Sequence, residues 1–484
     1  FNNKQCNYPR GKAVGGSSVI NLLIYVRGNK EDFDIWGSEN PGWDYESVLP
    51  YFKKSEYSTL DYEDPGYHGH HGPVSVETAK YHPDIRDTLL EAAVQRGRNI
   101  LDYNGRDQNG YSTFQMMTKG GRRYSSNKAF VKPVLHRKNL ELLDHTLGTK
   151  ILIKNKKAYG VEFIRNGIKY KATASKEVII SGGTINSPQI LMLSGIGPQE
   201  HLEELGIPVI QDLPVGQNFQ DHQIFPLFFS TNTSNENEPS LQNHIADYLE
   251  GNGILAVGSA VIGVGFESPT VKTKIPLAEY AFISARAEEI SPFFLNIMQM
   301  TKENWQAISK PLSRKNVWGV LPFLLHPKSI GSIKLKTKDP LDYPLLDTNL
   351  YSDKDGDDMK EMLAIIKDAF EISKTPAFQS IDSKYVSDPL PACTNCRHLS
   401  DDYWRCALRQ ITYPLLHGIA TCKMGPKSDK TAVINNELKV YGISGLRVAD
   451  ASVIPVSLSG HPTPAVYMIG EKASDLIRKE YGDF

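Results

Sequence analysis

The stretch of residues 150–183 shows the clearest regular pattern of apolar and polar positions in the chain. Short apolar runs, ILIK, AYGVEFI, KYKATA and EVIIS, alternate there with polar turns. The pair Asn166-Gly167 between two of these runs is a strong hairpin signal, because both residues tolerate the positive φ of a tight turn. The pattern therefore predicts a few short antiparallel strands, followed by a buried strand, EVIIS, and a glycine turn.

Further helices and strands are predicted on both sides of this region. Proline suits the first turn of a helix, so GGTINSPQILMLSG predicts a helix that begins near Ser187-Pro188. The alternation in GSIKLKTK, residues 331–338, predicts a half-buried antiparallel strand. The other predictions are a buried helix in the apolar run after Asn21, a loop over 232–238, a helix over 357–375, a strand over 446–448 and a helix over about 465–481. Buried strands typical of a parallel sheet occur beside alternating strands typical of an antiparallel one. The sequence therefore predicts two different sheets.

Length and composition limit the class of protein. A chain of 484 residues is too long for one ordinary core and favours two domains. The balance of 40% apolar and 23% charged residues is that of an ordinary globular protein. A net charge of −1 calls for neither nucleic acid nor an anionic membrane as a partner. No apolar run reaches the roughly 18 to 20 residues that span a bilayer.

Three of the five cysteines lie close together, in PACTNCRHLSDDYWRC. A zinc site needs four ligands, and only His398 is near enough to complete a set with Cys393, Cys396 and Cys406. The favoured interpretation is a local disulfide in a secreted protein, either Cys396–Cys406 or Cys393–Cys406, with no metal site. The sequon Asn232-Thr233-Ser234 predicts a glycoprotein in the same compartment.

The first motif that carries chemistry is RGKAVGGSSVINLLIYVRG, which begins at Arg10. Paired glycines followed by paired serines let a backbone come close to a ligand and offer N–H and hydroxyl donors. The string resembles the first signature of the glucose-methanol-choline (GMC) oxidoreductases, particularly their insect glucose dehydrogenase-like branch. In that family this loop lies against the flavin and its pyrophosphate. The resemblance therefore implies FAD as cofactor, contacted by Gly15, Gly16, Ser17, Ser18 and Asn21.

The resemblance continues along nearly the whole chain. GGTINSPQILMLSGIGP, residues 182–198, looks like the second signature of the family, with Gly183 and Thr184 where alanine and glycine are usual. VGQNFQDH (215–222) looks like the segment that leads towards the substrate domain, and HPKSIGSIKLKTKDP (326–340) resembles the substrate-domain sheet. The implied fold is an α/β flavin-binding, Rossmann-like domain interleaved with an α+β substrate domain built on an antiparallel sheet. The expected bounds are 1–60, 140–220 and 415–484 for the flavin-binding domain, and 61–139 and 221–414 for the substrate domain.

The resemblance implies that the unit that holds the ADP part of the flavin is not contained in this sequence. In the family, a strand, a glycine turn and a helix precede the RGK motif, and only nine residues stand there, beginning with Phe1. GNGILA (251–256) matches G-x-G-x-x-A, but it follows a helix-like run and is interpreted as a turn. Three explanations stay open. The chain is a fragment, or a cleavage product that remains bound to its N-terminal piece as a second chain, or a relative that no longer binds flavin.

Two histidines in the C-terminal part stand in motifs of the same family. His417 lies in LHGIATCKMG, similar to H-x-x-G-T-C-x-M-G with Ala420 in place of a glycine, and His461 lies in SGHPTPA. A neutral imidazole can take the hydroxyl proton of an alcohol near neutral pH, and a second donor can hold the oxygen. The resemblance implies His417 as the base, His461 as its hydrogen-bonding partner, and Asp450 and Ala451 beside the flavin.

Three other histidines, His68, His70 and His71, lie together in YHGHHGP. Glycines stand on both sides, and no acid or cysteine follows at a fixed spacing. They are therefore interpreted as part of a flexible loop rather than as metal ligands.

The sequence thus predicts an FAD-dependent dehydrogenase or oxidase that converts the CH–OH group of a small alcohol to a carbonyl, by hydride transfer to flavin N5. Its expected substrate is a carbohydrate, a sterol or an aromatic alcohol. Three alternatives remain open. They are a lyase acting on cyanohydrins with the same fold, a non-catalytic family member or fragment that does not bind flavin, and a nicotinamide dehydrogenase, for which no glycine fingerprint follows a strand.

Overall fold

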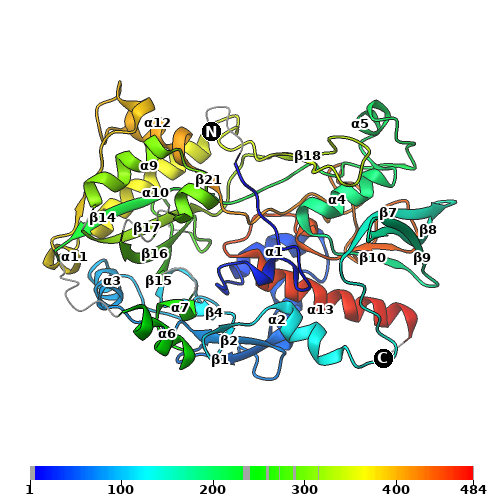
Figure 1. The fold of residues 1–484 in the computed structure, drawn as a ribbon, viewed down its shortest axis with the longest axis horizontal. Coiled ribbons are helices and arrows are strands. Elements are labelled where there is room, and N and C mark those ends of the chain that lie inside the picture. Colours follow the sequence, from blue (N-terminus) through cyan, green and yellow to red (C-terminus); the bar gives the residue numbers. More distant parts are fainter. Residues whose placement is uncertain are drawn as a thin grey trace.

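The computed structural model describes residues 6–232, 240–257, 261–271, 273–286, 290, 292–313 and 315–482. Two large hydrophobic cores organise the molecule. One lies between an antiparallel sheet and its helices, on the left of Figure 1, and the other surrounds α4 (Gly183–Leu193) and α13 (Pro462–Tyr481), on the right. Both halves of the sequence contribute to the second core, so the chain passes between the cores more than once. Among the described residues, no helix combines the length and the apolarity that a membrane span needs.

An eight-stranded antiparallel sheet forms the centre of the first core. All seven residues of β15 (Val261–Glu267) are buried, which means that both faces of this strand are covered. The strand order is β20 (Lys384–Tyr385), β14 (Leu227–Thr231), β17 (Asn316–Leu324), β16 (Ala278–Arg286), β15 and β3 (Gly110–Ser112), with β13 (Gln223–Ile224) pairing both β17 and β21 (Tyr413–Pro414). The antiparallel sheet that the sequence predicts is therefore present, but it is not built from residues 331–338.

Helices pack against this sheet. α10 (Asp357–Ser373) lies on β17, and α3 (Asp84–Gln95) lies on β15 and β3. The buried residues of α10 recur mostly at three- and four-residue spacing, which produces one apolar stripe. The predicted helix over 357–375 is confirmed. The other helices of this part are α6 (Leu241–Leu249), α7 (Ile254–Val257), α9 (Lys302–Ser309), α11 (Pro376–Ser380) and α12 (Asp401–Ile411).

A three-stranded antiparallel meander lies beside the second core. Its strands are β7 (Thr146–Lys154), β8 (Lys157–Arg165) and β9 (Ile168–Thr173). Asn166 and Gly167 join β8 to β9 with φ of 51° and 76°, the two positive values that a tight hairpin turn needs. β10 (Val178–Ile180) then pairs in parallel with β22 (Leu446–Val448). The predicted hairpin and the C-terminal strand are thus confirmed. The strand predicted in EVIIS is present, but it is only partly buried, because Ile179 in its middle is exposed.

Helix α4 begins earlier than the sequence predicts. It starts at Gly183 rather than near Ser187, so Pro188 lies inside the helix and has no N–H to donate. The carbonyl of Thr184, which this N–H would have bonded, accepts instead from Oγ1 of Thr421 at 2.6 Å. A hydrogen bond from a distant segment therefore replaces the one that proline cannot make.

The apolar run after Asn21 is extended, and the prediction of a helix there was wrong. Leu23 has a φ of 68°, outside the helical region. The N–H of Tyr25 donates to the carbonyl of Gln115, and the N–H of Met117 donates to the carbonyl of Leu23. The run satisfies its backbone groups through these distant segments, so an apolar composition alone did not reveal its conformation.

Residues 331–338 contain a strand, but in another part of the molecule than predicted. β18 (Ser332–Lys334) and β19 (Leu345–Asp347) form a two-stranded sheet of their own. Ile333 and Leu335 lie in the second core, beside α4, and not in the eight-stranded sheet. The half-buried alternation is confirmed, whereas the assignment to the substrate-domain sheet is wrong. A short run of alternating apolar and polar residues shows which face of the strand is buried. It does not show which other strand this strand will pair with.

The C-terminal helix α13 packs against α2 (Tyr45–Ser55). It begins at Pro462, slightly before the predicted start, because proline is accommodated in the first turn. Gly482 ends it in the left-handed conformation, with a φ of 75°. The remaining helices and strands are α1 (Lys30–Glu39), α5 (Gln199–Glu204), β1 (Glu56–Thr59), β2 (Val74–Thr78), β4 (Gln115–Met116), β5 (Thr118–Lys119), β6 (Arg122–Arg123), β11 (Ile196–Gly197) and β12 (Gln211–Asp212).

One disulfide joins Cys393 to Cys406, on α12. Cys396 is free, so of the two pairings that the sequence left open the structure contains Cys393–Cys406. Residues 233–239, which include two of the three sequon residues and most of the loop predicted over 232–238, lie outside the described residues.

Candidate active site

His417 lies in a bulge between two short antiparallel pairings. β21 pairs with β13 just before it, and just after it Ile419 exchanges backbone hydrogen bonds with Gln220, at 3.0 and 3.4 Å. Leu416 and Ala420 have φ of 66° and 68°, so the chain leaves the ladder and returns to it around the histidine. The glycine that the resembled motif carries at position 420 suits this conformation, whereas alanine adopts it with a strain of about 1 to 2 kcal/mol.

A buried carboxylate anchors the backbone of His417. Oδ1 of Asp221 accepts from the N–H of His417 at 2.8 Å, and Oδ2 accepts from the hydroxyl of Tyr8 at 2.6 Å. The oxygen of Tyr8 in turn accepts from the N–H of Gly418 at 3.1 Å. Burial raises the pKa of Asp221 to about 7, although these hydrogen bonds favour its charged form. Asp221 and Tyr8 together fix the loop that carries the predicted base.

The structure brings His417 and His461 together. Their ring centroids are 4.6 Å apart, with 48° between the ring planes. The backbone N–H of His461 donates to the carbonyl of Val26 at 3.1 Å, and Nε2 of its ring lies 2.9 Å from Oε1 of Glu279, which is fully buried on β16. The carboxylate and the backbone contact hold the His461 ring in one orientation beside His417.

The surroundings of His417 favour its neutral form. Burial lowers the pKa of His417 well below its usual range, and charge on His461 or His222 lowers it further. A neutral imidazole keeps a lone pair on one ring nitrogen and can accept a proton there. His417 as a whole residue is half-buried.

A cluster of polar side chains supports the turn that precedes His461. The carboxylate of Asp32 accepts from the backbone N–H of Ser459 at 2.6 Å, and Nε2 of His326 lies 2.8 Å from the hydroxyl oxygen of the same serine. The amide of Gln108 donates to the carbonyl of Ser459 at 2.5 Å. Contacts from three separate segments therefore position this turn.

Two residues of the histidine site were missed in the sequence. Nδ1 of His222 lies 3.0 Å from Nδ1 of His417, and Glu279 holds His461. The signal for His222 was its place at the end of the VGQNFQDH motif. The signal for Glu279 was a single charge inside the apolar run LAEYAFI, since a charge is buried in such a strand only with a partner.

The predicted flavin loop at the N-terminal end lies next to the helix that follows His461. Oγ of Ser17 accepts from a backbone N–H six residues earlier, and Oγ of Ser18 donates to the carbonyl of Gly15 at 2.6 Å. The side-chain amide of Asn21 donates to Oγ1 of Thr463, in the first turn of α13, at 3.4 Å. The loop and the histidine pair therefore belong to neighbouring parts of the structure.

Asp450 joins the other predicted flavin-binding segment to α4. Its Oδ2 accepts from the N–H of Gly183 at 2.9 Å and from the hydroxyl of Ser187 at 2.5 Å. Its Oδ1 accepts from the N–H of Ser452 at 2.8 Å, which caps the short 3₁₀ turn that begins at Ala451. The carboxylate thus ties the end of β22 to the start of the second glycine motif.

Both glycine segments have backbone that a ligand could approach. A Cβ added at Gly16 or at Gly183 would meet no atom within 4 Å, and both residues have positive φ, 55° and 77°. An open, side-chain-free backbone is what allows a ring system or a phosphate to come close to peptide groups. The residues present therefore fit a flavin cofactor at these two segments.

His68 is buried, and its interpretation as part of a flexible loop was wrong. Its side chain lies between two carboxylates, with Nε2 2.8 Å from Asp102 and Nδ1 3.0 Å from Glu56. Glu56 also pairs with Arg27 at 2.6 Å, and all four residues are at least 95% buried. Burial opposes charge on His68, but the two carboxylates outweigh it and raise its pKa to about 9. The acids lie 12 and 34 residues away in sequence, so the local motif did not reveal them.

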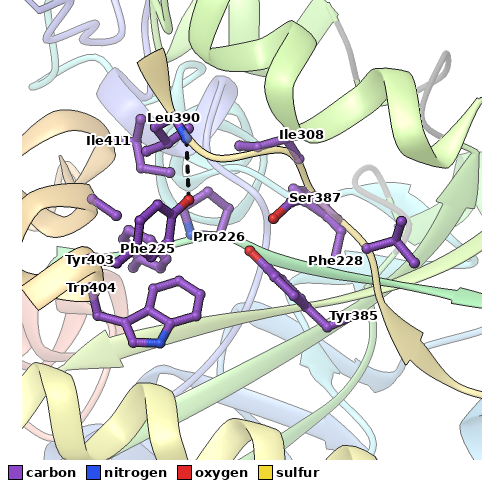
Figure 2. A pocket seen from close by; sticks show the side chains of 12 residues that line it. Phe225, Pro226, Phe228, Ile308, Tyr385, Ser387, Leu390, Tyr403, Trp404 and Ile411 are labelled. Atoms are coloured by element: carbon purple, nitrogen blue, oxygen red, sulfur yellow. Dashed lines mark hydrogen bonds between the residues drawn. The ribbon is translucent and has the colours of Figure 1, made fainter. Parts of the chain in front are cut away.

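An apolar pocket lies within the first core (Figure 2). Phe225, Tyr385 and Trp404 form much of its wall, and the hydroxyl of Tyr403 accepts from the N–H of Leu390 at 3.3 Å. No histidine or carboxylate lines this pocket, and none of the predicted site residues does so. It is therefore not the centre of the predicted chemistry.

Comparison with known proteins identifies one family along most of the chain. Two models of the GMC oxidoreductase family match residues 1–224 and 327–470. These ranges contain the N-terminal glycine motif, the second glycine motif and both predicted catalytic histidines.

Individual relatives agree with this result. A glucose dehydrogenase (FAD, quinone) of Drosophila pseudoobscura pseudoobscura is 36% identical over 99% of this chain and 76% of its own length. The mitochondrial choline dehydrogenase of Homo sapiens is 33% identical, over 97% of this chain and 76% of its own length. The solved structure of an FAD-dependent oxidoreductase from Chaetomium thermophilum has a TM-score of 0.83 at 28% identity, and covers 99% of this chain and 88% of its own.

The predicted fold class, an α/β flavin-binding domain interleaved with an α+β substrate domain, is confirmed by these comparisons. The predicted enzyme class and cofactor, an oxidoreductase that uses FAD, are confirmed at the level of the family, whose members here are FAD-dependent dehydrogenases. The chain belongs to the GMC oxidoreductase family.

Proposed function

We propose that this chain catalyses the FAD-dependent oxidation of an alcohol to a carbonyl compound, with His417 as the general base. The observation that carries the proposal is the pair of rings, His417 and His461, at 4.6 Å, with His417 in surroundings that keep it neutral. A neutral imidazole can take the hydroxyl proton while the C–H bond of the alcohol carbon breaks. FAD, when bound, would supply the acceptor for the two electrons and the hydrogen that leave this carbon.

The other site residues have supporting roles in this proposal. His461, fixed by Glu279, stands beside the base and would hold the substrate oxygen and stabilise the negative charge that develops on it. Gly15, Gly16, Ser17, Ser18, Asn21, Asp450 and Ala451 would contact the cofactor. Glucose and choline, the substrates named in the relatives, are the first alcohols to test, followed by sterols and aromatic alcohols.

The test is flavin reduction under anaerobic conditions. Purified native protein is mixed with each alcohol, and the loss of flavin absorbance near about 450 nm is followed. The His417→Ala variant should reduce its flavin about 10² times more slowly or worse, the scale of a general base. The control is His201→Ala, on α5, because His201 is also a histidine that accepts a backbone hydrogen bond, from Leu335 at 3.0 Å. Equal reduction rates in His417→Ala and the wild type would refute the assignment of the base.

The same assay distinguishes oxidation from the lyase alternative. A lyase acting on cyanohydrins performs no net redox chemistry, so its flavin would stay oxidised with every alcohol. Protein that is colourless near about 450 nm would support a family member without flavin. Bleaching by an alcohol, together with formation of the matching aldehyde or ketone, is the expected result.

We also propose a division into two domains and secretion of the protein. The two hydrophobic cores support a flavin-binding domain over 1–60, 140–220 and 415–484 and a substrate domain over 61–139 and 221–414. Two short segments depart from this division: Leu23, Ile24 and Val26 lie in the first core, and Ile333 and Leu335 lie in the second. The disulfide supports secretion, which detection of the glycosylated protein in culture medium would test.

A further inference from the structure

We propose that His222 sets the tautomer of His417. In this assignment His222 accepts a hydrogen bond from Nδ1–H of His417, and this leaves Nε2 of His417 as the nitrogen that takes the substrate proton. His222 is thus a positioning residue that acts through His417. The role of Nε2 in catalysis rests on the proposed function, whereas the hydrogen bond and the tautomer can be measured without it.

The geometry requires one ring to donate and the other to accept. The two Nδ1 atoms are 3.0 Å apart, and the ring planes stand at 81° with centroids 5.2 Å apart. A neutral imidazole carries one N–H and one lone pair, so a contact of this length between two neutral rings fixes both tautomers at once. Either Nδ1 of His417 donates, and its Nε2 is the acceptor, or the reverse holds.

Two backbone carbonyls near His222 support the proposed direction of the bond. Interaction with the backbone of Leu325 and of Leu458 favours a proton on His222 and partly opposes the lowering of its pKa by burial. A carbonyl only accepts, so the ring must present an N–H to these groups. Nδ1 of His222 is engaged with His417, which leaves Nε2 of His222 as the donor to the carbonyls. Nδ1 of His222 then bears the lone pair that accepts from His417.

His222 remains in this state over a wide range of pH. Its side chain is 3% exposed, and burial, together with charge on His326 and His461, lowers its pKa to about 3. A second proton, which would remove the acceptor at Nδ1, is therefore bound only in strong acid. The hydrogen-bonding role of His222 does not change across neutral pH.

The neighbouring residue holds the backbone of the same histidine. Asp221 accepts from the N–H of His417 at 2.8 Å, and the carbonyl of His222 accepts from the N–H of Leu415 at 2.9 Å. Two consecutive residues therefore fix His417 at its main chain and at its ring. A flip of the His417 ring by 180° would replace Nδ1 with a carbon and break the contact with His222.

The other titratable groups around His417 leave its Nε2 free. His461 is bonded to Glu279, His326 lies beside Ser459 and Asp32, and Asp221 is bonded to Tyr8 and to the backbone. Within the part of the chain that the structure describes, no group hydrogen-bonds Nε2 of His417. The lone pair that His222 places on this atom is therefore available to a substrate.

The test compares two substitutions of similar size at position 222. His222→Asn retains an acceptor oxygen at the position of Nδ1, whereas His222→Leu fills the space without one. Protein labelled with ¹⁵N in its histidines reports which ring nitrogen carries the proton, and the signals of His417 are identified by their loss in His417→Ala. We expect Nδ1 of His417 to be protonated in the wild type and in His222→Asn, and the proton to move to Nε2 in His222→Leu.

Reduction kinetics provide the second measurement. His222→Leu should reduce its flavin about 10² times more slowly, with KM changed less than kcat. The reason is that Nε2 of His417 would already carry a proton and could not accept the one from the substrate. His222→Asn should recover most of this loss. His201→Leu, which removes another accepting histidine on α5, should lie within about twofold of the wild type and reports any general effect of replacing such a histidine.

The two proposals fail in different ways. A wild-type His417 that is protonated at Nε2, or a tautomer that does not respond to His222→Leu, overturns the role of His222 whatever the activity. If His417→Ala reduces its flavin at the wild-type rate while the tautomer responds as expected, the assignment of the base fails and the hydrogen bond to His222 stands. The proposal is supported if His222→Leu reduces its flavin slowly and alters the tautomer of His417, while His222→Asn restores both.

Discussion

The buried charges around His68 give the molecule a stability that depends on pH in a definite direction. The pKa of His68 is raised from about 6.5 to about 9 by Asp102 and Glu56, in spite of burial. A raised pKa means that the folded state binds the proton more tightly than the unfolded chain. The stabilisation is therefore fully present below about pH 6.5 and is lost as the pH rises through about 9. At 1.36 kcal/mol per pKa unit, it amounts to about 3 kcal/mol.

The perturbation that isolates this contribution is His68→Gln. Glutamine can still donate a hydrogen bond to one carboxylate, but it carries no charge and does not titrate. Urea-induced unfolding, followed by tryptophan fluorescence from pH 6 to pH 10, gives the free energy of unfolding of both proteins. The difference between the wild type and His68→Gln should fall by about 3 kcal/mol across this range, since groups that do not contact His68 titrate equally in both.

The control is the same substitution at an exposed histidine. His136→Gln should unfold like the wild type at every pH, because the side chain of His136 lies at the surface. A difference between the wild type and His68→Gln that stays constant with pH, or that grows as the pH rises, would show that His68 is not held as a cation in the folded protein.

Two further outcomes are expected. Cys406→Ala should lower the free energy of unfolding by about 3 kcal/mol, the chain-entropy value for a loop near the 13-residue separation of Cys393 and Cys406, and calorimetry can measure the drop in Tm. Cys396→Ala, which removes a free thiol, is the control, and an equal Tm for Cys406→Ala and the wild type would contradict the stabilising role of the disulfide. Glu279→Gln keeps an acceptor beside His461 but removes its charge, so flavin reduction should slow by about 10- to 10²-fold, the equivalent of about 1.5 to 3 kcal/mol. A pH profile and rate equal to those of the wild type would exclude an electrostatic role for Glu279.

The elements found from the sequence are those whose own residues contain the necessary information. The turn Asn166-Gly167 has the two residue types that its positive φ values require, and the hairpin follows from it. The helix over 357–373 carries its apolar stripe within one continuous segment. The histidine pair was also found, because His417 and His461 each stand in a recognisable motif and the fold places the two motifs side by side.

The elements that were missed depend on partners far away in the sequence. Thr421 supplies the contact that lets α4 continue through Pro188, and Gln115 supplies the acceptor that keeps Tyr25 in an extended segment. The same explanation applies to His68, whose partners are acids outside its motif. A charge such as Glu279 inside an apolar strand shows that a partner exists but does not identify it. Sequence patterns therefore indicated the proposed reacting groups more readily than the residues that contact them.

The bond between Tyr8 and Gly418 has a consequence for how the protein is made. The two residues are 410 positions apart, and Tyr8 also anchors Asp221 under the predicted base. At synthesis rates of about 5 to 20 residues per second, Tyr8 leaves the ribosome about 20 to 80 seconds before its partner exists. The site can close only after Gly418 has been translated. During this interval Tyr8 is without these contacts, and incompletely folded chains are prone to aggregation.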